Sequence, residues 1–399
     1  MPELRHVRLW NGLEDQYYAR IVWDEGVIRK VDPDTPQSRG DDLSVIPGLI
    51  DTHVHLASYA GRDAQDYRTW PLITPITTQV LHAYANARRA LAVGVTTVRD
   101  MESGWCQISL RDAVNQEVLK GPRVLAFGMV SMTGGHADLF TPAAVQSRPL
   151  PTADGPDACR RQVRIYARMG MDGIKIATGG GVLSVGDKPQ WRNYTDAENE
   201  AIVDEAHALG LPVGAHAHDE LSIDAALRAG VDSLEHGTLI TEAQARVVAA
   251  RPMTVAPTLL INDRIANGDT VVPAAIQTKA QDLVRRRDQQ LRQAVQRGVR
   301  CVLGTDSSGL LMPFGLQWHE LTAMQNVLGL SSEETLRAAT SQAATTIGLG
   351  DRLGQVRPGY AADFVLMRGM AWLDLHESCA EQIVAVVASG NVTVGHLPE

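Results

Sequence analysis

The chain has 399 residues, of which 44% are hydrophobic and 21% are charged, and this ordinary globular composition excludes disorder and collagen. Its 46 acidic residues outnumber its 37 basic ones, and the net charge of −9 argues against a nucleic-acid or polybasic membrane partner. The length suits one large fold with a small addition.

Both ends of the chain carry short alternating segments that predict strands joined by tight turns. These strand-like segments are residues 7–9, 21–23, 27–28, 362–366, 383–387 and 392–394. Two strand-rich ends that enclose a different middle predict one discontinuous domain. We expect a small β-sandwich built from residues 1–48 and 352–399.

Between the ends, short apolar runs alternate with helical stretches rich in Ala, Arg and Glu. The eight strand candidates are Leu49–Leu56, Val95–Arg99, Val124–Met129, Gly173–Thr178, Val213–His218, Ser233–Gly237, Thr254–Pro257 and Arg300–Thr305. The helical candidates include residues 84–93, 157–168, 197–209 and 278–297. Eight strand–helix alternations predict an α/β fold, a closed (β/α)8 TIM barrel over residues 49–351. An open doubly wound sheet is the alternative, but its glycine fingerprint does not follow the first strand.

Several of the helical segments end on a glycine, where a helix C-terminal cap favours the left-handed backbone conformation. These glycines are Gly94, Gly170, Gly210, Gly230 and Gly298. Their positions support the predicted helix ends.

Histidines mark the end of the first barrel strand. A strand has a side-chain period of two, so His53 and His55 point to the same side, about 7 Å apart along the chain. This spacing lets two imidazoles bind one cation of the zinc type. Alone, the pair is weak evidence, and a core or surface role is the simpler interpretation.

Three further strand candidates end in residues of the same kind, and barrel enzymes place their chemistry at these ends. The fifth ends with His216 and His218, the sixth with His236, and the eighth with Asp306. Five of the twelve histidines of the chain therefore lie at the ends of three strands. This clustering, together with the acid, predicts a metal site.

Lys175 lies inside the apolar run 173–177, in a chain with only five lysines against 32 arginines. A buried ammonium is unfavourable unless it is paired or neutralised. One interpretation pairs Lys175 with an interior acid such as Asp100 or Asp172. The other is a neutral amine that has captured CO2, which yields a carbamate able to bridge two metal ions. Charge counting favours the carbamate, because it, Asp306 and a hydroxide offset most of the charge of two divalent cations.

These motifs resemble those of the amidohydrolase superfamily of metal-dependent hydrolases. The matching segments are residues 46–56, 94–100, Lys175, His216, 233–237, 304–306 and 361–365. Residues 133–136 and 173–182 are most similar to the prolidase and Xaa-Arg carboxypeptidase branch, close to imidazolonepropionase-like sequences. The resemblance implies a binuclear centre bridged by carboxylated Lys175 and a hydroxide. Its implied ligands are His53, His55 and Asp306 for one metal and His216 and His236 for the other.

The resemblance also implies a mechanism. The bridging hydroxide attacks the scissile carbonyl, and Asp306 takes a proton from it and passes that proton to the leaving amine. His218 and His136, the latter in the loop after the third strand, are expected to contact the substrate or its oxyanion. Related dipeptidases often carry a tyrosine at the position of His218. Zinc is the expected metal, with manganese, cobalt or iron as alternatives.

The predicted activity is hydrolysis of the amide bond of dipeptides or N-acyl amino acids. The same site would serve a cyclic-amide or lactone hydrolase, or an ester or phosphotriester hydrolase. A mononuclear deaminase is less favoured, because Asp219 stands where such relatives carry glutamate and Lys175 would have no role. A scaffold without catalysis is least favoured, since every expected ligand is present. Substrate choice is expected to depend on residues 58–70, 133–140, 182–191 and 307–318.

The sequence also suggests where the protein works. No apolar run reaches the roughly 18 residues of a membrane span, and the first twenty residues lack the apolar core of a signal peptide. The four cysteines form no Cys-x-x-Cys pair, which favours reduced thiols. We expect a cytoplasmic protein, with a small-molecule substrate and without nucleic-acid or membrane partners, that forms a homo-oligomer.

Overall fold

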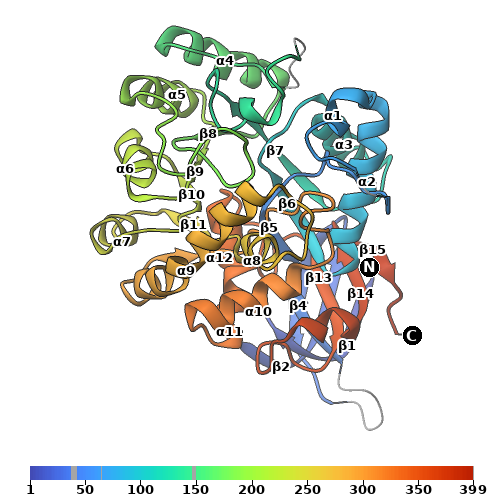
Figure 1. Cartoon of the computed structure of the whole chain (residues 1–399). Coiled ribbons are helices and arrows are strands. Elements are labelled where there is room, and N and C mark those ends of the chain that lie inside the picture. The colour runs from blue at the N-terminus through green and yellow to red at the C-terminus, as the bar shows by residue number, and fades with distance from the viewer. Residues whose placement is uncertain (37–42, 64, 146–149, 399) are drawn as a thin grey trace.

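The computed structural model describes residues 1–36, 43–63, 65–145 and 150–398. An eight-stranded parallel sheet with surrounding helices is joined to a seven-stranded sheet built from both chain ends (Figure 1). Of the residues predicted to form the small domain, 37–42 and 399 lie outside the described part. Within the described residues, no helix combines the length and the apolar character that crossing a membrane requires.

All eight predicted barrel strands form, and each pairs in parallel with its neighbour in the chain. They are β5 (Leu49–Val54), β6 (Val95–Asp100), β7 (Arg123–Val130), β8 (Gly173–Ala177), β9 (Val213–Ala217), β10 (Ser233–His236), β11 (Thr254–Ala256) and β12 (Arg300–Cys301). The segment after β12 returns to β5, because the Thr52 N–H donates to the Leu303 carbonyl at 2.9 Å. The Asp306 N–H likewise donates to the His53 carbonyl at 2.8 Å. These bonds close the predicted barrel.

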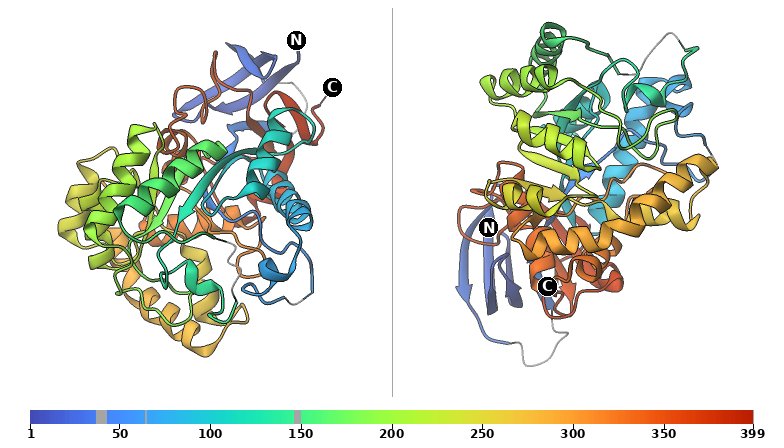
Figure 2. Two further views of the ribbon diagram at one scale, coloured as in Figure 1. Left: turned by 90° about the horizontal axis from the view of Figure 1, so that it is seen from above. Right: turned by 60° about the vertical axis from the view of Figure 1, so that its left-hand side comes forward.

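Helices cover the outside of the barrel (Figure 2). They are α1 (Trp70–Ile73), α2 (Ile76–Ala92), α3 (Trp105–Asn115), α4 (Pro156–Met169), α5 (Asp196–Ala208), α6 (Glu220–Ala229), α7 (Glu242–Ala249), α8 (Leu259–Asn267), α9 (Ala274–Gln296), α10 (Gln317–Leu328), α11 (Ser332–Ala338) and α12 (Ser341–Thr346), with 3-10 turns η1 (Asp138–Phe140) and η2 (Glu377–Gln382). The four expected helical segments lie in α2, α4, α5 and α9. Helix α2 begins earlier than predicted, directly after Pro75, whose fixed φ suits a helix start.

The glycines predicted to end helical segments all adopt the left-handed conformation, with φ between +72° and +93°. They are Gly94, Gly170, Gly210, Gly230 and Gly298. A residue with a Cβ would be strained at such a φ. The turns from helix to strand therefore depend on these positions.

Carboxylates stabilise the lower end of the barrel, where the strands begin. Asp172 lies directly before β8, and its Oδ2 accepts the N–H of Ala126 in β7 at 2.8 Å. Asp232 lies directly before β10, and its Oδ2 accepts the N–H of Val213 in β9 at 2.7 Å. Each carboxylate thus links the start of its own strand to the preceding one.

The second sheet gathers both ends of the chain, and the two termini lie close together beside it (Figures 1 and 2). Its strands are β1 (Glu3–Trp10), β2 (Asp15–Asp24), β3 (Val27–Pro33), β4 (Leu43–Pro47), β13 (Phe364–Arg368), β14 (Ile383–Ala388) and β15 (Asn391–Gly395), in the order β15-β14-β13-β4-β1-β2-β3. Trp23 of β2 and Phe364 of β13 lie three places apart in this order, yet their ring centroids are 5.1 Å apart. The sheet therefore curls over a shared core, as predicted for a small sandwich from both ends. The exact boundaries of this domain stay a prediction.

Alternation along the barrel strands separates the helix-facing core from the interior. In β8, Ile174 and Ile176 belong to the core between strands and helices, and Lys175 takes the opposite face. In β9, Ala215 belongs to that core and His216 follows on the interior face. The polar side chains predicted from the sequence are therefore directed into the barrel.

Candidate metal centre

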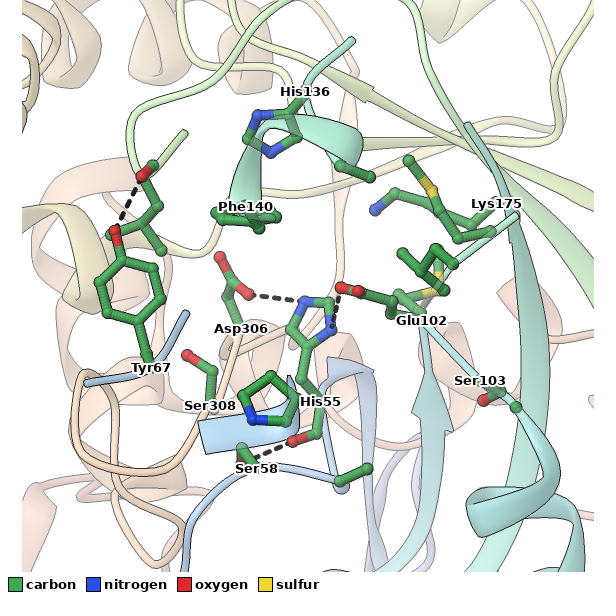
Figure 3. Close-up of a pocket in the computed structure, with 18 of the residues that line it drawn as sticks. His55, Ser58, Tyr67, Glu102, Ser103, His136, Phe140, Lys175, Asp306 and Ser308 are labelled. Atoms are coloured by element: carbon green, nitrogen blue, oxygen red, sulfur yellow. Dashed lines mark hydrogen bonds and ion pairs between the residues drawn. The ribbon is translucent and has the colours of Figure 1, made fainter. Parts of the chain in front are cut away.

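The residues predicted to bind metal meet at the carboxyl end of the barrel strands. They are His53 in β5, His55 directly after it, Lys175 in β8, His216 in β9, His236 in β10 and Asp306 after β12. The Oδ1 atom of Asp306 lies 3.0 Å from His55 Nε2 (Figure 3). It lies 3.7 Å from His53 Nε2. The ring centroids of His53 and His236 are 5.2 Å apart, and those of His216 and His236 are 4.6 Å apart.

Two overlapping groups of three side chains could each hold a cation. Potential ligand atoms of His216, His218 and His236 lie within 4.8 Å of one another, and so do those of His53, His236 and Asp306. His236 belongs to both groups, so the two groups form one continuous site. His218, which the sequence indicated as a substrate contact, also lies within reach of a metal bound by His216 and His236.

Hydrogen bonds fix the ring orientation of two of the imidazoles. The Nδ1–H of His53 donates to Glu235 Oε2 at 2.8 Å, and the Nε2–H of His216 donates to the Gly180 carbonyl at 3.1 Å. Because both partners only accept, the opposite ring nitrogens of His53 and His216 carry the lone pair. Such outer partners orient metal-binding histidines in proteins.

The other two buried imidazoles are held by threonine hydroxyls. His218 Nδ1 lies 2.7 Å from Thr238 Oγ1, and His236 Nδ1 lies 2.7 Å from Thr258 Oγ1. Each ring therefore keeps its Nε2 atom available on the side away from the threonine. His53 and His216 thus offer a nitrogen lone pair to a cation, whereas the tautomer of His218 and His236 decides whether their Nε2 atom accepts or donates.

Glu235 contacts a candidate metal ligand, and the sequence analysis gave it no role. Its carboxylate is fully buried, and Arg99 Nη2 lies 2.8 Å from Oε1. Burial opposes the ionised form, but Arg99 and His53 outweigh it and hold the pKa of Glu235 well below its usual range. Glu235 therefore connects a permanent cation to a candidate metal ligand. Its place directly before His236 was the available signal.

Burial keeps the four buried imidazoles of this site neutral, whereas Asp306 outweighs burial at His55 and raises the pKa of that imidazole. Burial lowers the pKa of His53 to about 4 and the pKa of His218 to about 3. It also lowers the pKa values of His216 and His236 well below the ordinary value for histidine. Neutral imidazole is the form that binds a metal ion, so the donor set fits a divalent cation.

Lys175 is 4% exposed, and its amine points into the cavity (Figure 3). Burial lowers its pKa to about 8. Neither interior acid considered from the sequence is its partner. Asp100 accepts the N–H of Leu56 at 2.6 Å, and Asp172 pairs with Arg111 at 2.9 Å at the opposite end of the barrel. Among the described residues, no carboxylate forms an ion pair with Lys175.

Three residues at the strand ends have an unusual backbone. Thr258, Asp306 and His236 have φ values of +46°, +55° and +72°, in the left-handed region that side chains with a Cβ rarely adopt. Such strain persists only where the surrounding structure imposes it, and it is concentrated at functional sites. The backbone therefore directs the side chains of His236 and Asp306 into the centre.

His136 approaches the centre from the loop after β7. Its ring stacks on that of His216 with a centroid distance of 4.2 Å, and its Nδ1 lies 2.7 Å from Ser184 Oγ. This approach requires glycine at position 181, because a Cβ there would lie 2.0 Å from His136 Cε1. Lys279 of α9 donates to the carbonyl oxygens of Gly181 and Ser184 at 2.9 and 2.7 Å. The loop that holds His136 is therefore anchored on both sides.

A cavity of about 650 Å³ opens above these residues. All four segments expected to determine the substrate contribute to its wall, with Tyr67, Phe140, Val182 and Leu310 as examples. Residue 64, within the first segment, lies outside the described part of the chain. The wall is rich in aromatic and aliphatic side chains, which suits an apolar substrate.

Glu102 is a second residue that the sequence analysis missed. It follows β6, lines the cavity, and its Oε2 lies 3.7 Å from His55 Nδ1 (Figure 3). That nitrogen has no hydrogen-bond partner among the described residues. Burial raises the pKa of Glu102. An acid close after the end of a strand was the available signal. Asp100, the last residue of β6, is also an acid, so the sequence did not show which of the two faces the cavity.

Comparison with known proteins places the chain among amidohydrolases. The amidohydrolase family matches residues 44–395. An ochratoxinase of Aspergillus niger is 30% identical over 345 residues, covering 81% of this chain and 70% of that protein. An imidazolonepropionase of Rhizorhabdus wittichii is 26% identical over 374 residues, covering 84% and 82%. The crystal structure of an Xaa-Pro dipeptidase with methionine in its active site aligns with a TM-score of 0.88 at 30% identity, covering 98% and 99%.

Proposed function

Because the chain belongs to the prolidase-like branch of the amidohydrolase family and is therefore a hydrolytic enzyme, we propose that it cleaves amide bonds of dipeptides or N-acyl amino acids at a binuclear metal centre. The observation that carries this proposal is the convergence of neutral imidazoles, one carboxylate and a buried amine at the carboxyl end of the barrel. The family likeness to an Xaa-Pro dipeptidase supports the choice of peptide-type bonds.

The proposed ligand set is the one that the family resemblance implies, and four of its residues, His53, His216, His236 and Asp306, belong to the two groups of possible ligands. His53, His55 and Asp306 would hold one metal, and His216 and His236 would hold the other. The amine of Lys175 attacks CO2, which forms an N–C bond, releases one proton and leaves a carbamate whose oxygen atoms would serve as metal ligands. Its lowered pKa of about 8 supports this step, because part of the amine is neutral near pH 7.

Each residue of the site has a separate task in the proposed reaction. Bound divalent metal ions, expected to be zinc, lower the pKa of water and polarise the scissile carbonyl. The Asp306 carboxylate accepts a proton from the attacking water and delivers it to the leaving amine. His136 and His218 donate hydrogen bonds to the oxyanion of the tetrahedral intermediate. His218 is held for this task by Thr238.

Other reactions considered for this site differ in their support. Hydrolysis of a cyclic amide, lactone, ester or phosphotriester would use the same residues. Deamination has less support, because Asp219 Oδ1 accepts the N–H of Ser222 at 3.0 Å and thereby caps α6. A carboxylate engaged in that cap does not shuttle protons for a deaminase.

Metal analysis and a substrate library test the proposal together. We expect purified protein to contain about two divalent metal ions per chain and to hydrolyse members of a library of dipeptides and N-acyl amino acids. Chelation should abolish turnover, and added zinc should restore it. Protein that binds no metal ion, or that turns over no amide after metal loading, would contradict the proposal.

The remaining expectations concern the partners, the location and the oligomeric state of the enzyme. The cavity of about 650 Å³ supports a small-molecule substrate, and the net charge of −9 disfavours nucleic acid and anionic membranes as partners. We also propose a cytoplasmic homo-oligomer. Light scattering on the purified protein would reveal its molecular mass, and a monomer of 43.2 kDa would contradict the assembly.

A further inference from the structure

Part of the wall of the cavity at the metal centre comes from helices α3 and α4 and from Met129, which pairs with Lys175 across β7 and β8. We call this part the α3/α4 arm. It is lined by Trp105 and Cys106 of α3, Met129 of β7, and Gln162, Ile165, Tyr166 and Met169 of α4. None of these residues has a role in the reaction proposed above.

The residues of α4 form one continuous face of the helix. Positions 162, 165, 166 and 169 follow the spacing of three, four and seven residues that places side chains on one side. The outer end of the arm reaches the surface, where Ile165 is 37% exposed and Trp105 is 57% exposed. The α3/α4 arm therefore includes residues that solvent reaches.

The inner wall of the arm is rigid. The Tyr166 hydroxyl donates to the Met129 carbonyl at 2.7 Å, which fixes the ring against β7. Gly128 permits this approach, because a Cβ at that position would lie 2.7 Å from Tyr166 Cδ2. A preformed apolar wall binds an apolar group without having to order itself first.

The cavity wall on the other side of the centre contains Arg68 and Tyr67. Figure 3 shows Tyr67 and Ser308 on one side of His55 and Lys175 on the other. Among the described residues, Arg68 and Lys175 are the only lysine or arginine side chains that line the cavity. Lys175 belongs to the centre, so Arg68, which also pairs with Asp66, is the cation available to a substrate carboxylate beside Tyr67.

We propose that the α3/α4 arm binds an extended apolar acyl group, so that the substrates are N-acyl amino acids with long alkyl or aromatic acyl chains. This inference rests on the proposed function and names its substrate class. The amino-acid carboxylate lies on the Arg68 side, and the acyl chain extends past Lys175 between α3 and α4. Each methylene buried in the arm raises kcat/KM about fourfold, from the usual free energy of burying one methylene.

A chain-length series tests this arrangement. We would measure kcat/KM of the metal-loaded enzyme for N-acetyl-, N-butanoyl-, N-hexanoyl- and N-octanoyl-leucine. Ile165→Glu places a charge in the arm at a partly exposed position, so it should fold. The expected result is a steep rise with chain length in the unaltered enzyme. In Ile165→Glu, the octanoyl substrate loses about tenfold or more and the acetyl substrate changes less than twofold.

Leu221→Glu is the matched control, because Leu221 is 64% exposed on α6 and does not line the cavity. It should keep the chain-length profile. A profile that Ile165→Glu leaves unchanged would overturn the proposal. The proposal would also be overturned if kcat/KM did not change with acyl length but rose for N-acetyl amino acids with longer side chains. The arm would then bind the amino-acid side chain instead of the acyl group.

Binding measured by calorimetry tests the arm independently of the proposed reaction. Affinity of N-octanoyl- over N-acetyl-leucine is measured on the same proteins without turnover. If no substrate is hydrolysed but the octanoyl preference is present and lost in Ile165→Glu, the arm is correct and the proposed reaction is wrong. If neither binding nor turnover depends on chain length, the arm proposal fails by itself.

Discussion

At the lower end of the barrel, carboxylates are paired with basic side chains. Asp172 lies 2.9 Å from Arg111, and Asp232 lies 2.9 Å from His207. At the upper end, buried imidazoles lie against one another, with the ring centroids of His218 and His236 4.4 Å apart. The same strands therefore carry pairs of acidic and basic side chains where they begin and clustered imidazoles where they end.

This difference separates stability from chemistry. Carboxylates that pair with a basic side chain and also accept a strand N–H stabilise the fold at this solvent-exposed end. Imidazoles gathered in a buried site do not stabilise one another. Burial lowers their pKa values and keeps them neutral, so their nitrogen lone pairs remain available to a ligand. In barrel enzymes the upper end holds the active site and the lower end holds the fold together. Substitutions at the upper end should therefore reduce activity with little change in stability, and those at the lower end should reduce stability with little change in activity.

The largest expected effect is that of Asp306→Asn. Loss of the carboxylate removes both a proposed ligand and the proposed proton carrier, so kcat/KM should fall by about 10³-fold or more. The melting temperature should change little, because Asp306 neutralises no permanent cation. Steady-state kinetics and thermal unfolding measure the two quantities. Activity within tenfold of the unaltered enzyme would remove Asp306 from the mechanism.

Lys175→Ala should reduce activity by about 10²-fold, with part of the metal lost. Because the substitution leaves a space, acetate or propionate should enter and restore part of the turnover. Lys175→Met fills that space and serves as the control, so added carboxylic acids should not rescue it. Full activity and metal content in Lys175→Ala without any additive would rule out a bridging carbamate.

Glu235→Gln tests the link between Arg99 and His53. The amide keeps the shape of the side chain but loses the charge that orients the Nδ1–H of His53 at 2.8 Å. Metal affinity should fall by about 10–100-fold, the usual effect of losing such a partner. Competition with a metal chelator measures the affinity. An affinity equal to that of the unaltered protein would show that His53 needs no orienting carboxylate.

The parts of the fold and site that local spacing determines were predictable. Strand alternation places Lys175 and His216 inside the barrel, and the helix-ending glycines adopt the predicted left-handed conformation because no other residue does so without strain. The predicted strands of the small domain did not include β4, which lies in the middle of its sheet and joins the two chain ends. Its residues 43–47 alternate too little to be distinguished from the barrel strand that follows.

Features that depend on distant segments could not be predicted from local patterns. The α4 face that includes Ile165 has ordinary helix spacing, and nothing nearby in the sequence shows that it lines a cavity. Glu102 likewise becomes significant only because His55 lies 3.7 Å away. The left-handed backbone at His236 and Asp306 has no sequence signal, since neither residue is glycine. Tertiary packing imposes these features.

At the lower end, Asp172→Asn should reduce stability and leave the chemistry unchanged. The amide weakens the contacts with Arg111 and with the Ala126 N–H at 2.8 Å, so the free energy of unfolding should fall by about 1 kcal/mol. Urea unfolding measures this change, and kcat/KM should stay within twofold. A large loss of activity without a loss of stability would contradict the division between the two ends.

The smallest effect is expected for His207→Gln. His207 and Asp232 are 43% and 45% exposed, so solvent screens their interaction and the free energy of unfolding should change by less than about 0.5 kcal/mol. Asp232→Asn in the same background should cost more, because Asp232 Oδ2 also accepts the Val213 N–H at 2.7 Å. A double-mutant cycle by urea unfolding separates the two contributions. A His207 effect as large as that of Asp232 would mean that the ion pair, rather than the bond to the strand, stabilises this end of the barrel.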